Sequence, residues 1–254
     1  EIEEKLAGEG IKLQRVKPLK HAYKVIGSKH PLTRTASFQE GLFYIQDKAS
    51  CFAAEVADPK PKMTVLDVCA APGAETTYLA QLMQNQGMIC SVDYSKRRMK
   101  EWKEEVSRMG VKMAVPVIAD ARNSFPFEVE ADIVVLDPPC TSTGAFGKLP
   151  SAKWRITPQS IETMAGIQWQ MIDNCVEKVK SGGILTYSTC SITVEENEMI
   201  VERFLKWHPE FSLAEINPKI GLPGLRGLEK CQRLYPHVHH SNGFFIAKLL
   251  RNET

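Results

Sequence analysis

Apolar residues recur along most of this chain with the spacing expected for alternating strands and helices. From residue 63 onward, short apolar runs predict buried strands at 64–68, 88–92, 114–119, 131–136, 184–188 and 243–250. Amphipathic segments between them predict helices at 74–86, 95–109 and 158–180. Strands that alternate with helices are typical of an α/β fold with a doubly wound, mostly parallel sheet.

Two of the predicted helices carry N-terminal signals. Thr157 is the expected N-cap of the helix at 158–180, with Pro158 in its first turn. The expected core face of this helix consists of Ile161, Met164, Ala165, Ile172, Cys175, Val176 and Val179. A later helix is expected to open with a capping box of Thr193 and Glu196. Its expected buried side chains are Ile200, Val201, Phe204 and Leu205.

Residues 1–47 have a different pattern and predict a small α+β module ahead of a larger domain at 48–254. A helix and three strand-like segments are predicted in it, at 1–7, 11–16, 22–26 and 42–46. A helix at 49–57 and a linker at 58–62 follow. Because the chain starts with Glu1 and the module lacks a clear beginning, we expect a processed chain or part of a longer one.

Reactive side chains follow two of the buried strands. Asp137-Pro138-Pro139-Cys140 comes directly after the run at 133–136, and its prolines hold the backbone extended. A structural turn with a buried cysteine explains this tetrapeptide equally well. However, Cys190 ends the run at 183–186 in the same way. Since ligands bind at the carboxyl ends of parallel strands, the two thiols are predicted to face one pocket.

Acidic residues end three successive strands and predict a nucleoside site. Asp67 precedes a turn of small residues, and Asp93, about 20 residues beyond that turn, can accept ribose hydroxyls. Asp120 can accept from an adenine amino group. Each acid is also compatible with a helix cap. No G-x-G-x-x-G motif occurs, so the combination favours S-adenosylmethionine (SAM) over a dinucleotide.

The connection at 138–157 is about 20 residues long without apolar periodicity, a length that is usually functional or disordered. It contains Lys153, Trp154 and Arg155, which suit phosphates and stacked bases. A tryptophan that fills a core gap beside two solvated charges is the equally weighted alternative.

Composition narrows the class of protein. The 254 residues are 43% hydrophobic and 24% charged, enough for one large domain and a partial second. Seven cysteines without a C-x-x-C pair are atypical of a disulfide framework or a zinc site. No apolar run has the length of a membrane span, and no signal peptide is evident. We therefore expect a soluble, cytoplasmic protein without a metal.

The charge is uneven although the formal net charge is only +2. Residues 11–38 contain no acid and seven basic residues, which are Lys12, Arg15, Lys17, Lys20, Lys24, Lys29 and Arg34. This basic arm is predicted to face a polyanion, with a solvated surface as the alternative.

Ordered motifs give the chain a family resemblance. They are Asp67-x-Cys-Ala-Ala-Pro-Gly, Asp93-x-Ser95-x-x-Arg98, Asp137-Pro-Pro-Cys140-Thr-Ser-Thr-Gly144, Thr189-Cys190-Ser191, Arg233-Leu-Tyr-Pro-His237 and Gly243-Phe-Phe-Ile-Ala. Over about residues 38 to 250, the chain resembles the Sun (Fmu) family of RNA 5-methylcytosine methyltransferases. The resemblance implies a Rossmann-like SAM-dependent methyltransferase domain preceded by an RNA-binding module, with rRNA or tRNA as the partner.

The resemblance also implies roles for single residues. Cys190 would be the nucleophile, Cys140 would assist product release, and Asp137 would hold the cytosine. The expected cofactor-binding residues are Cys69, Ala70, Ala71, Pro72, Gly73, Ala74, Glu75, Asp93, Arg98, Asp120 and Asp137. The target base would have to leave its stack.

One position departs from the family pattern. The family has Gly-Lys where this chain has Ala74-Glu75, and this lysine belongs near the base and the nucleophile. A glutamate reverses the charge and is expected to raise the pKa of a neighbouring thiol. It is the main support for an alternative, a non-catalytic RNA-binding or ribosome-assembly protein.

Two other interpretations have less support. An Asp-Pro-Pro motif followed by an aromatic residue is typical of base amino-group methyltransferases, but Cys140 occupies the aromatic position here. His237, His239 and His240 suggest a metal, yet they lack ligand-like partners in the sequence.

Overall fold

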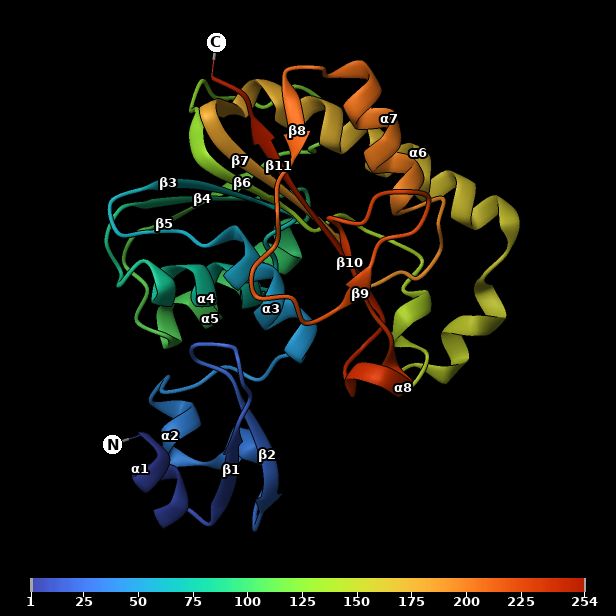
Figure 1. Ribbon diagram of the computed structural model, residues 1–254. Coiled ribbons are helices and arrows are strands. Elements are labelled where there is room, and N and C mark those ends of the chain that lie inside the picture. The colour runs from blue at the N-terminus through green and yellow to red at the C-terminus, as the bar shows by residue number, and fades with distance from the viewer. Residues whose placement is uncertain (1, 254) are drawn as a thin grey trace.

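A central sheet with helices on both faces forms the larger part of the protein, and a small module lies below it (Figure 1). The structure is a computed structural model and describes residues 2–253. The sheet strands are β3 (Thr64–Val68), β4 (Met88–Asp93), β5 (Ala114–Ile118), β6 (Ala131–Leu136), β7 (Val179–Thr189), β8 (Phe211–Leu213), β9 (Leu222–Pro223), β10 (Gln232–Leu234) and β11 (Phe244–Arg251).

The strand order confirms the predicted doubly wound, mostly parallel sheet. It runs β5-β4-β3-β6-β7-β11-β10-β9, and β8 pairs with β11. Strands β3 to β7 are parallel to their neighbours, whereas β11 runs antiparallel to β7. The order reverses between β3 and β6, and in α/β sheets ligands bind outside the carboxyl ends at such a point.

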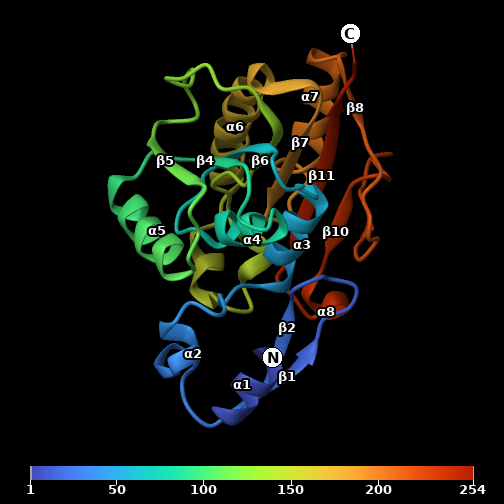
Figure 2. The same cartoon turned by 90° about the vertical axis from the view of Figure 1, so that its left-hand side faces the viewer.

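Apolar side chains on both faces of the central strands explain why their sequences are continuously hydrophobic. On one face, Val65, Ile133 and Val135 pack in the core with α3 (Lys48–Ala57) and α4 (Ala74–Leu82). On the other, Leu66 and Val134 pack with α6 (Pro158–Cys175) and α7 (Glu198–Trp207). Helix α5 (Lys96–Arg108) lies beside α4 (Figure 2).

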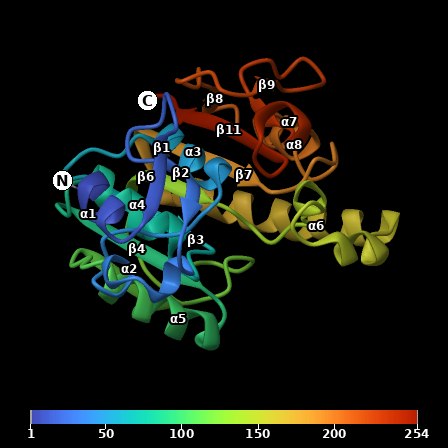
Figure 3. The ribbon, with the colours of Figure 1, turned by 90° about the horizontal axis from the view of Figure 1, so that it is seen from below.

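The N-terminal module comprises α1 (Ile2–Gly8), the antiparallel strands β1 (Ile11–Arg15) and β2 (Tyr23–Ser28), the 3₁₀ turn η1 (Leu32–Arg34) and α2 (Ala36–Gln39). Seen from below, α1, β1 and β2 lie over α3 and α4 (Figure 3).

The predicted strand at 42–46 is wrong, because this segment has irregular backbone. The Arg108 guanidinium takes up local carbonyls instead, donating to the oxygens of Phe38 at 2.6 Å and Phe43 at 3.3 Å. Gly41 has a φ of +75°, and a Cβ there would lie 1.8 Å from the Arg108 oxygen. This close approach to the end of α5 needs a glycine.

The helix predicted at 158–180 is too long at its C-terminal end. Helix α6 stops at Cys175, the 3₁₀ turn η4 (Val176–Lys178) follows, and β7 begins at Val179. The predicted core positions Ile161, Met164 and Ala165 are only partly buried, because the first half of α6 projects past the sheet (Figure 3).

Two further helix boundaries differ from the prediction. The helix expected to reach residue 86 ends at Leu82. The predicted capping box is wrong, since α7 begins at Glu198 with Asn197 as its N-cap. Thr193 and Glu196 belong to the loop before the helix. Within residues 2–253, no helix is long and apolar enough to cross a membrane.

Candidate active site

Two thiols meet where β6 and β7 end. Cys140 follows β6, Cys190 follows β7, and their sulfur atoms lie 3.3 Å apart. The Ser142 hydroxyl oxygen lies 3.4 Å from the Cys190 sulfur and 3.9 Å from that of Cys140. Parallel neighbouring strands place their C-terminal loops side by side, so residues 50 positions apart form one hydrogen-bonded cluster.

The two thiols have opposite acidities. Hydrogen bonding from Cys140, supported by Ser142, lowers the pKa of Cys190 to about 7 against the opposing effect of burial. The same contact and burial hold the pKa of Cys140 well above its ordinary value. Near neutral pH a large fraction of Cys190 is therefore a thiolate, and the Cys140 thiol is able to donate to it.

The Asp137 carboxyl lies beside this pair. Burial raises its pKa well above the ordinary value, and the negative charge of Glu75 adds to the effect. A neutral carboxylic acid has one donor and one acceptor. Asp137 is thus able to donate to a ring nitrogen and accept from an exocyclic amino group of one base.

Glu75, the second residue of α4, does not act on the thiol as expected. The pKa of Cys190 is lowered, and the carboxylate charge that opposes this comes from Glu196. Glu75 instead raises the pKa of Asp137 and Asp67. Burial raises the pKa of Glu75 itself. The reversed charge therefore favours neutral carboxyl groups in the site.

A buried carboxylate that we assigned to a helix cap joins the loops that carry the thiols. Glu196 accepts from the Thr141 amide at 2.8 Å and hydroxyl at 2.5 Å in the Cys140 loop. It also accepts from the hydroxyls of Ser191 at 2.7 Å and Thr193 at 2.8 Å in the Cys190 loop. Gln168 of α6 donates to it at 2.9 Å. In the sequence, the neighbouring hydroxyl residues Ser191 and Thr193 were the signal that Glu196 could accept several hydrogen bonds.

A glycine contact fixes the two loops further. The Gly144 amide donates to the Cys190 carbonyl at 2.9 Å, and the Gly144 carbonyl accepts from Gly243 at 2.8 Å. A Cβ at Gly144 would lie 2.1 Å from the Gly243 oxygen, so a larger residue cannot fit.

A buried ion pair contacts the loop that follows Cys190. Arg233 donates through two nitrogens to the Glu198 carboxylate, at 2.6 and 2.5 Å. A third nitrogen donates to the Ile192 carbonyl at 3.0 Å, two residues after Cys190.

The turn after β3 has the shape of a close ligand approach. Gly73 has a φ of +114°, and a Cβ there would lie 3.3 Å from the Trp102 ring. Cys69 also has a positive φ, of 68°. Ala70 and Ala71 are buried, Pro72 is exposed, and α4 begins at Ala74 with its N-terminus at this turn.

Asp93 is held in a way that leaves acceptor capacity. One carboxylate oxygen accepts from the Ser95 amide at 2.9 Å and the other from Arg98 at 3.0 Å. Arg98 also donates to the Ala71 carbonyl and so ties the acid to the turn. A carboxylate oxygen has about two acceptor sites, so each can still accept a ribose hydroxyl. These residues fit the nucleoside and carboxylate of SAM.

The other two strand-end acids have internal partners. Asp67 accepts from the Thr76 hydroxyl at 2.5 Å, and burial raises its pKa to about 7. Asp120 accepts from Arg122 through both carboxylate oxygens, with a shortest distance of 2.6 Å. The adenine contact of Asp120 stays a prediction.

The structure shows the surroundings of Trp154 and of the histidines near the C-terminus. Trp154 is 82% exposed, so the interpretation as a core-filling side chain is wrong. The Lys153 ammonium lies 5.4 Å from its ring centroid. His239 accepts at Nδ1 from the Tyr235 amide at 2.8 Å. Among the described residues, no group of three or more His, Cys, Asp or Glu side chains is placed to hold a metal ion.

Solved structures share this fold. A methyltransferase homologue from Pyrococcus horikoshii aligns with a TM-score of 0.88 and 33% identity, covering 98% of this chain and 81% of its own. NSun6 from Pyrococcus horikoshii with SFG aligns with a TM-score of 0.82 and 38% identity, covering 92% of this chain and 60% of its own.

Sequence relatives and a family match agree with the resemblance. A tRNA (cytosine(72)-C(5))-methyltransferase of Pyrococcus horikoshii is 39% identical over 86% of this chain and 54% of its own length. A probable ribosomal RNA small subunit methyltransferase B of Bacillus subtilis is 33% identical over 98% and 56%. The chain thus spans about half the length of these relatives. Residues 54–250 match the family described as 16S rRNA methyltransferase RsmB/F, and the chain therefore belongs to this family.

Proposed function

We propose that the protein transfers a methyl group from SAM to carbon 5 of a cytosine in RNA through a covalent bond between Cys190 and carbon 6. The observation that carries the proposal is the 3.3 Å thiol pair, in which Cys190 has a pKa of about 7. Relatives named as rRNA and tRNA cytosine-C5 methyltransferases support the reaction and the RNA substrate.

The nucleophile and the acid act together on the base. The Cys190 thiolate adds to carbon 6, and the electron pair of the C5–C6 double bond moves to carbon 5 and the ring. Neutral Asp137 donates to N3, where negative charge develops, and accepts from the amino group. Burial raises the pKa of Asp137 and so favours the protonated form that can donate.

When bound, SAM would supply the methyl group as an electrophile for carbon 5 and would leave as S-adenosylhomocysteine. Removal of the C5 proton by a base such as water then re-forms the C5–C6 double bond, and Cys190 leaves as a thiolate. Cys140, 3.3 Å away, stabilises the departing thiolate by a hydrogen bond. The second thiol thereby assists product release.

The turn from Cys69 to Glu75, Asp93, Asp120 and Asp137 would hold SAM, with Arg98 fixing Asp93 against the turn. Asp93 would accept the ribose hydroxyls, and the amides of the α4 N-terminus would bind the carboxylate. The NSun6 relative solved with SFG, an analogue of SAM, supports this cofactor.

RNA would bind across the N-terminal module and the loop at 138–157. All seven residues of the basic arm are exposed, and so is Trp154. Exposed lysines and arginines suit phosphates, and an exposed tryptophan suits a stacked base.

Bisulfite sequencing of cellular RNA, with and without the gene, tests the proposal. We expect methylated cytosines to disappear on deletion and to return with the wild-type gene but not with Cys190→Ala. An unchanged methylation map would favour a non-catalytic RNA-binding protein, and loss of an N4-methylcytosine signal on deletion, measured by mass spectrometry of nucleosides, would favour amino-group methylation.

SAM binding is expected to depend strongly on Asp93. Asp93→Ala removes the proposed acceptor of both ribose hydroxyls, and calorimetry should show affinity about 10- to 100-fold weaker, the range for hydrogen bonds to a charged group. Asp173→Ala, on α6 beside His208, is the control and should bind SAM normally. Equal affinity in both variants would contradict the assignment.

Cys190 alkylation is expected to follow the thiolate. Because its pKa is lowered to about 7, the iodoacetamide rate should rise between about pH 6 and 8 and then level off. Cys140→Ala removes the main cause of the low pKa and should move this rise toward pH 9, as measured by peptide mass spectrometry. An unshifted profile would mean that Cys140 does not stabilise the thiolate.

A further inference from the structure

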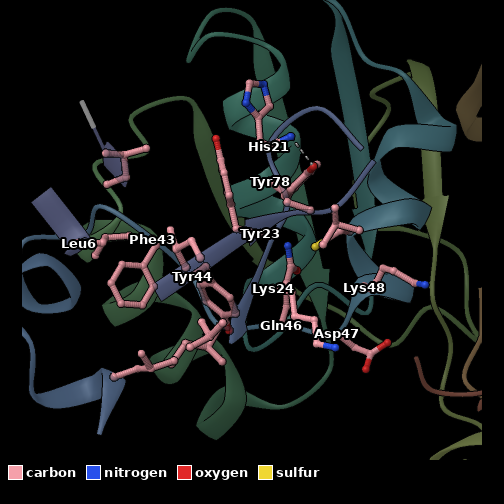
Figure 4. A pocket seen from close by; sticks show the side chains of 18 of the residues that line it. Leu6, His21, Tyr23, Lys24, Phe43, Tyr44, Gln46, Asp47, Lys48 and Tyr78 are labelled. Atoms are coloured by element: carbon pink, nitrogen blue, oxygen red, sulfur yellow. Dashed lines mark hydrogen bonds between the residues drawn. The ribbon is translucent and has the colours of Figure 1, made fainter. Parts of the chain in front are cut away.

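A cavity of about 670 Å³ lies between the N-terminal module and α3 and α4, outside the thiol site (Figure 4). Strands β1 and β2 form one side, and residues 42–48 and α4 form another. Its volume falls within the range of pockets that hold small molecules or single groups of a larger ligand.

Aromatic rings line this cavity on two sides. Tyr23 of β2, with Phe43 and Tyr44, faces Tyr78 of α4. The Tyr78 ring is buried, and its hydroxyl donates to Glu55 at 2.6 Å and accepts from the His21 amide at 3.4 Å. These walls are therefore held in place and present ring surfaces on which a planar group can stack.

One polar atom in the cavity lacks a partner. The Gln46 side-chain oxygen is buried and accepts no hydrogen bond from any of the residues that the structure describes. Gln46 lies among the residues that line the cavity (Figure 4). An unpaired buried acceptor costs about 1–3 kcal/mol, so a ligand with an N–H donor is favoured. Nucleobases carry such donors on their edges.

Two lysines, Lys24 and Lys48, line the cavity. His239 also lines it, but burial lowers its pKa and favours its neutral form, so it adds no positive charge. Lys48 and Lys24 are close enough that the charge of Lys24, added to burial, lowers the pKa of Lys48. The acid that lines the cavity, Asp47, already accepts from Lys148 at 2.7 Å. This excess of cations suits a phosphate group.

We propose that the cavity binds a nucleotide of single-stranded RNA next to the target cytosine. Its base would stack on Tyr44 and donate to Gln46, and its phosphate would lie at Lys24 and Lys48. That the neighbouring base is a target cytosine rests on the proposed function.

The position of the cavity fits a neighbouring nucleotide. Asp47, which lines the cavity, accepts from Lys148 at 2.7 Å, and Lys148 lies in the loop that follows Cys140, so the cavity adjoins the thiol site. Tyr78 and Thr77, which line the cavity, directly follow the first turn of α4 that borders the cofactor turn. A strand with one base in each pocket would pass over the start of α4.

Photocrosslinking tests the proposal directly. Single-stranded RNA octamers of random sequence, each with one 4-thiouridine, are irradiated with the protein, and the crosslinked peptides are identified by mass spectrometry. We expect crosslinks at Tyr23, Phe43 or Tyr44. Crosslinks confined to other surfaces would overturn the proposal. A protein segment or a small apolar molecule found in the cavity in solution would also overturn it.

Matched variants make the result quantitative. Gln46→Leu keeps the size of the side chain but removes the acceptor, and Gln86→Leu makes the same change at an exposed position between α4 and β4, outside the cavity and the N-terminal module. RNA affinity should fall about tenfold for Gln46→Leu and stay unchanged for Gln86→Leu. Tyr44→Ala should also lose about tenfold, the loss of one stacked base. Equal affinities for the two leucine variants would contradict the role of Gln46.

The outcomes separate this proposal from the proposed function. If the protein does not methylate cytosine, the bisulfite signal fails while crosslinks to the cavity persist. If only the cavity assignment is wrong, methylation persists and the crosslinks lie elsewhere.

Discussion

Replacement of Cys190 by alanine is expected to abolish methyl transfer and to leave no covalent complex with RNA. Carbon 5 of cytosine becomes nucleophilic only after a thiolate has added at carbon 6. Cys140 does not replace Cys190 in this step, because its pKa is raised whereas that of Cys190 is lowered. The loss should be at least about a thousandfold, the order found when a covalent nucleophile is removed.

Replacement of Cys140 is expected to give a different defect. In Cys140→Ala the remaining thiol still attacks, although at higher pH, because its pKa is no longer lowered by the 3.3 Å contact. Elimination then lacks the stabilising hydrogen bond. The protein should therefore accumulate RNA attached through Cys190, seen as a slowly migrating band on a denaturing gel.

These two variants are each other's control, since both remove one sulfur from the same cluster. An adduct in Cys190→Ala and none in Cys140→Ala would reverse the assignment and make Cys140 the nucleophile. If the wild type shows neither adduct nor turnover with cellular RNA, the non-catalytic interpretation gains support.

The sequence was sufficient to predict the family and most of the architecture. Continuous apolar runs such as the one at 133–136 are typical of strands buried on both faces, and the six strands predicted in the larger domain are present. Adjacent parallel strands end at one edge of the sheet. Cys140 and Cys190 each follow the end of a predicted strand. Their proximity could therefore be predicted by placing these two strands side by side in the sheet.

Tertiary contacts explain what the sequence could not predict. The apolar segment at 42–46 has the composition of a strand, but Arg108, 65 residues away from Phe43, takes its carbonyl. The spacing of Thr193 and Glu196 matches a capping box, yet Glu196 accepts from Thr141, 55 residues away. Local patterns contain no information about such distant partners.

The effect of the Glu75 charge on its neighbours also could not be predicted from the sequence pattern. A glutamate near a thiol is expected to raise the thiol pKa, but the direct contact with Cys140 outweighs distant charges at Cys190. Only the three-dimensional placement shows that the Glu75 charge acts on Asp137. The same residue therefore favours a neutral acid at Asp137 without preventing a thiolate at Cys190.

Glu196→Gln is expected to separate the two thiols while leaving the fold in place. Every group within hydrogen-bond distance of the Glu196 carboxylate donates to it. An amide NH₂ in place of one oxygen would therefore either face the N–H donors of Thr141 and Gln168 or force the hydroxyls to reverse their hydrogen bonds. A buried mismatch of this kind costs about 1–3 kcal/mol in the free energy of unfolding. The loops of Thr141 and Ser191 would move apart to relieve it.

The pKa of Cys190 distinguishes a positioning role from a purely structural one. Removal of the Glu196 charge alone would lower this pKa below about 7, because that charge raises it. Loss of the Cys140 contact, which is the larger effect, would raise it. We therefore expect the alkylation profile of Glu196→Gln to move to higher pH, together with a fall in methyl transfer. Glu195→Gln makes the same charge change at an exposed neighbour and should leave both unchanged. A profile that moves to lower pH with normal turnover would show that Glu196 acts on Cys190 only through its charge and does not hold the thiols together.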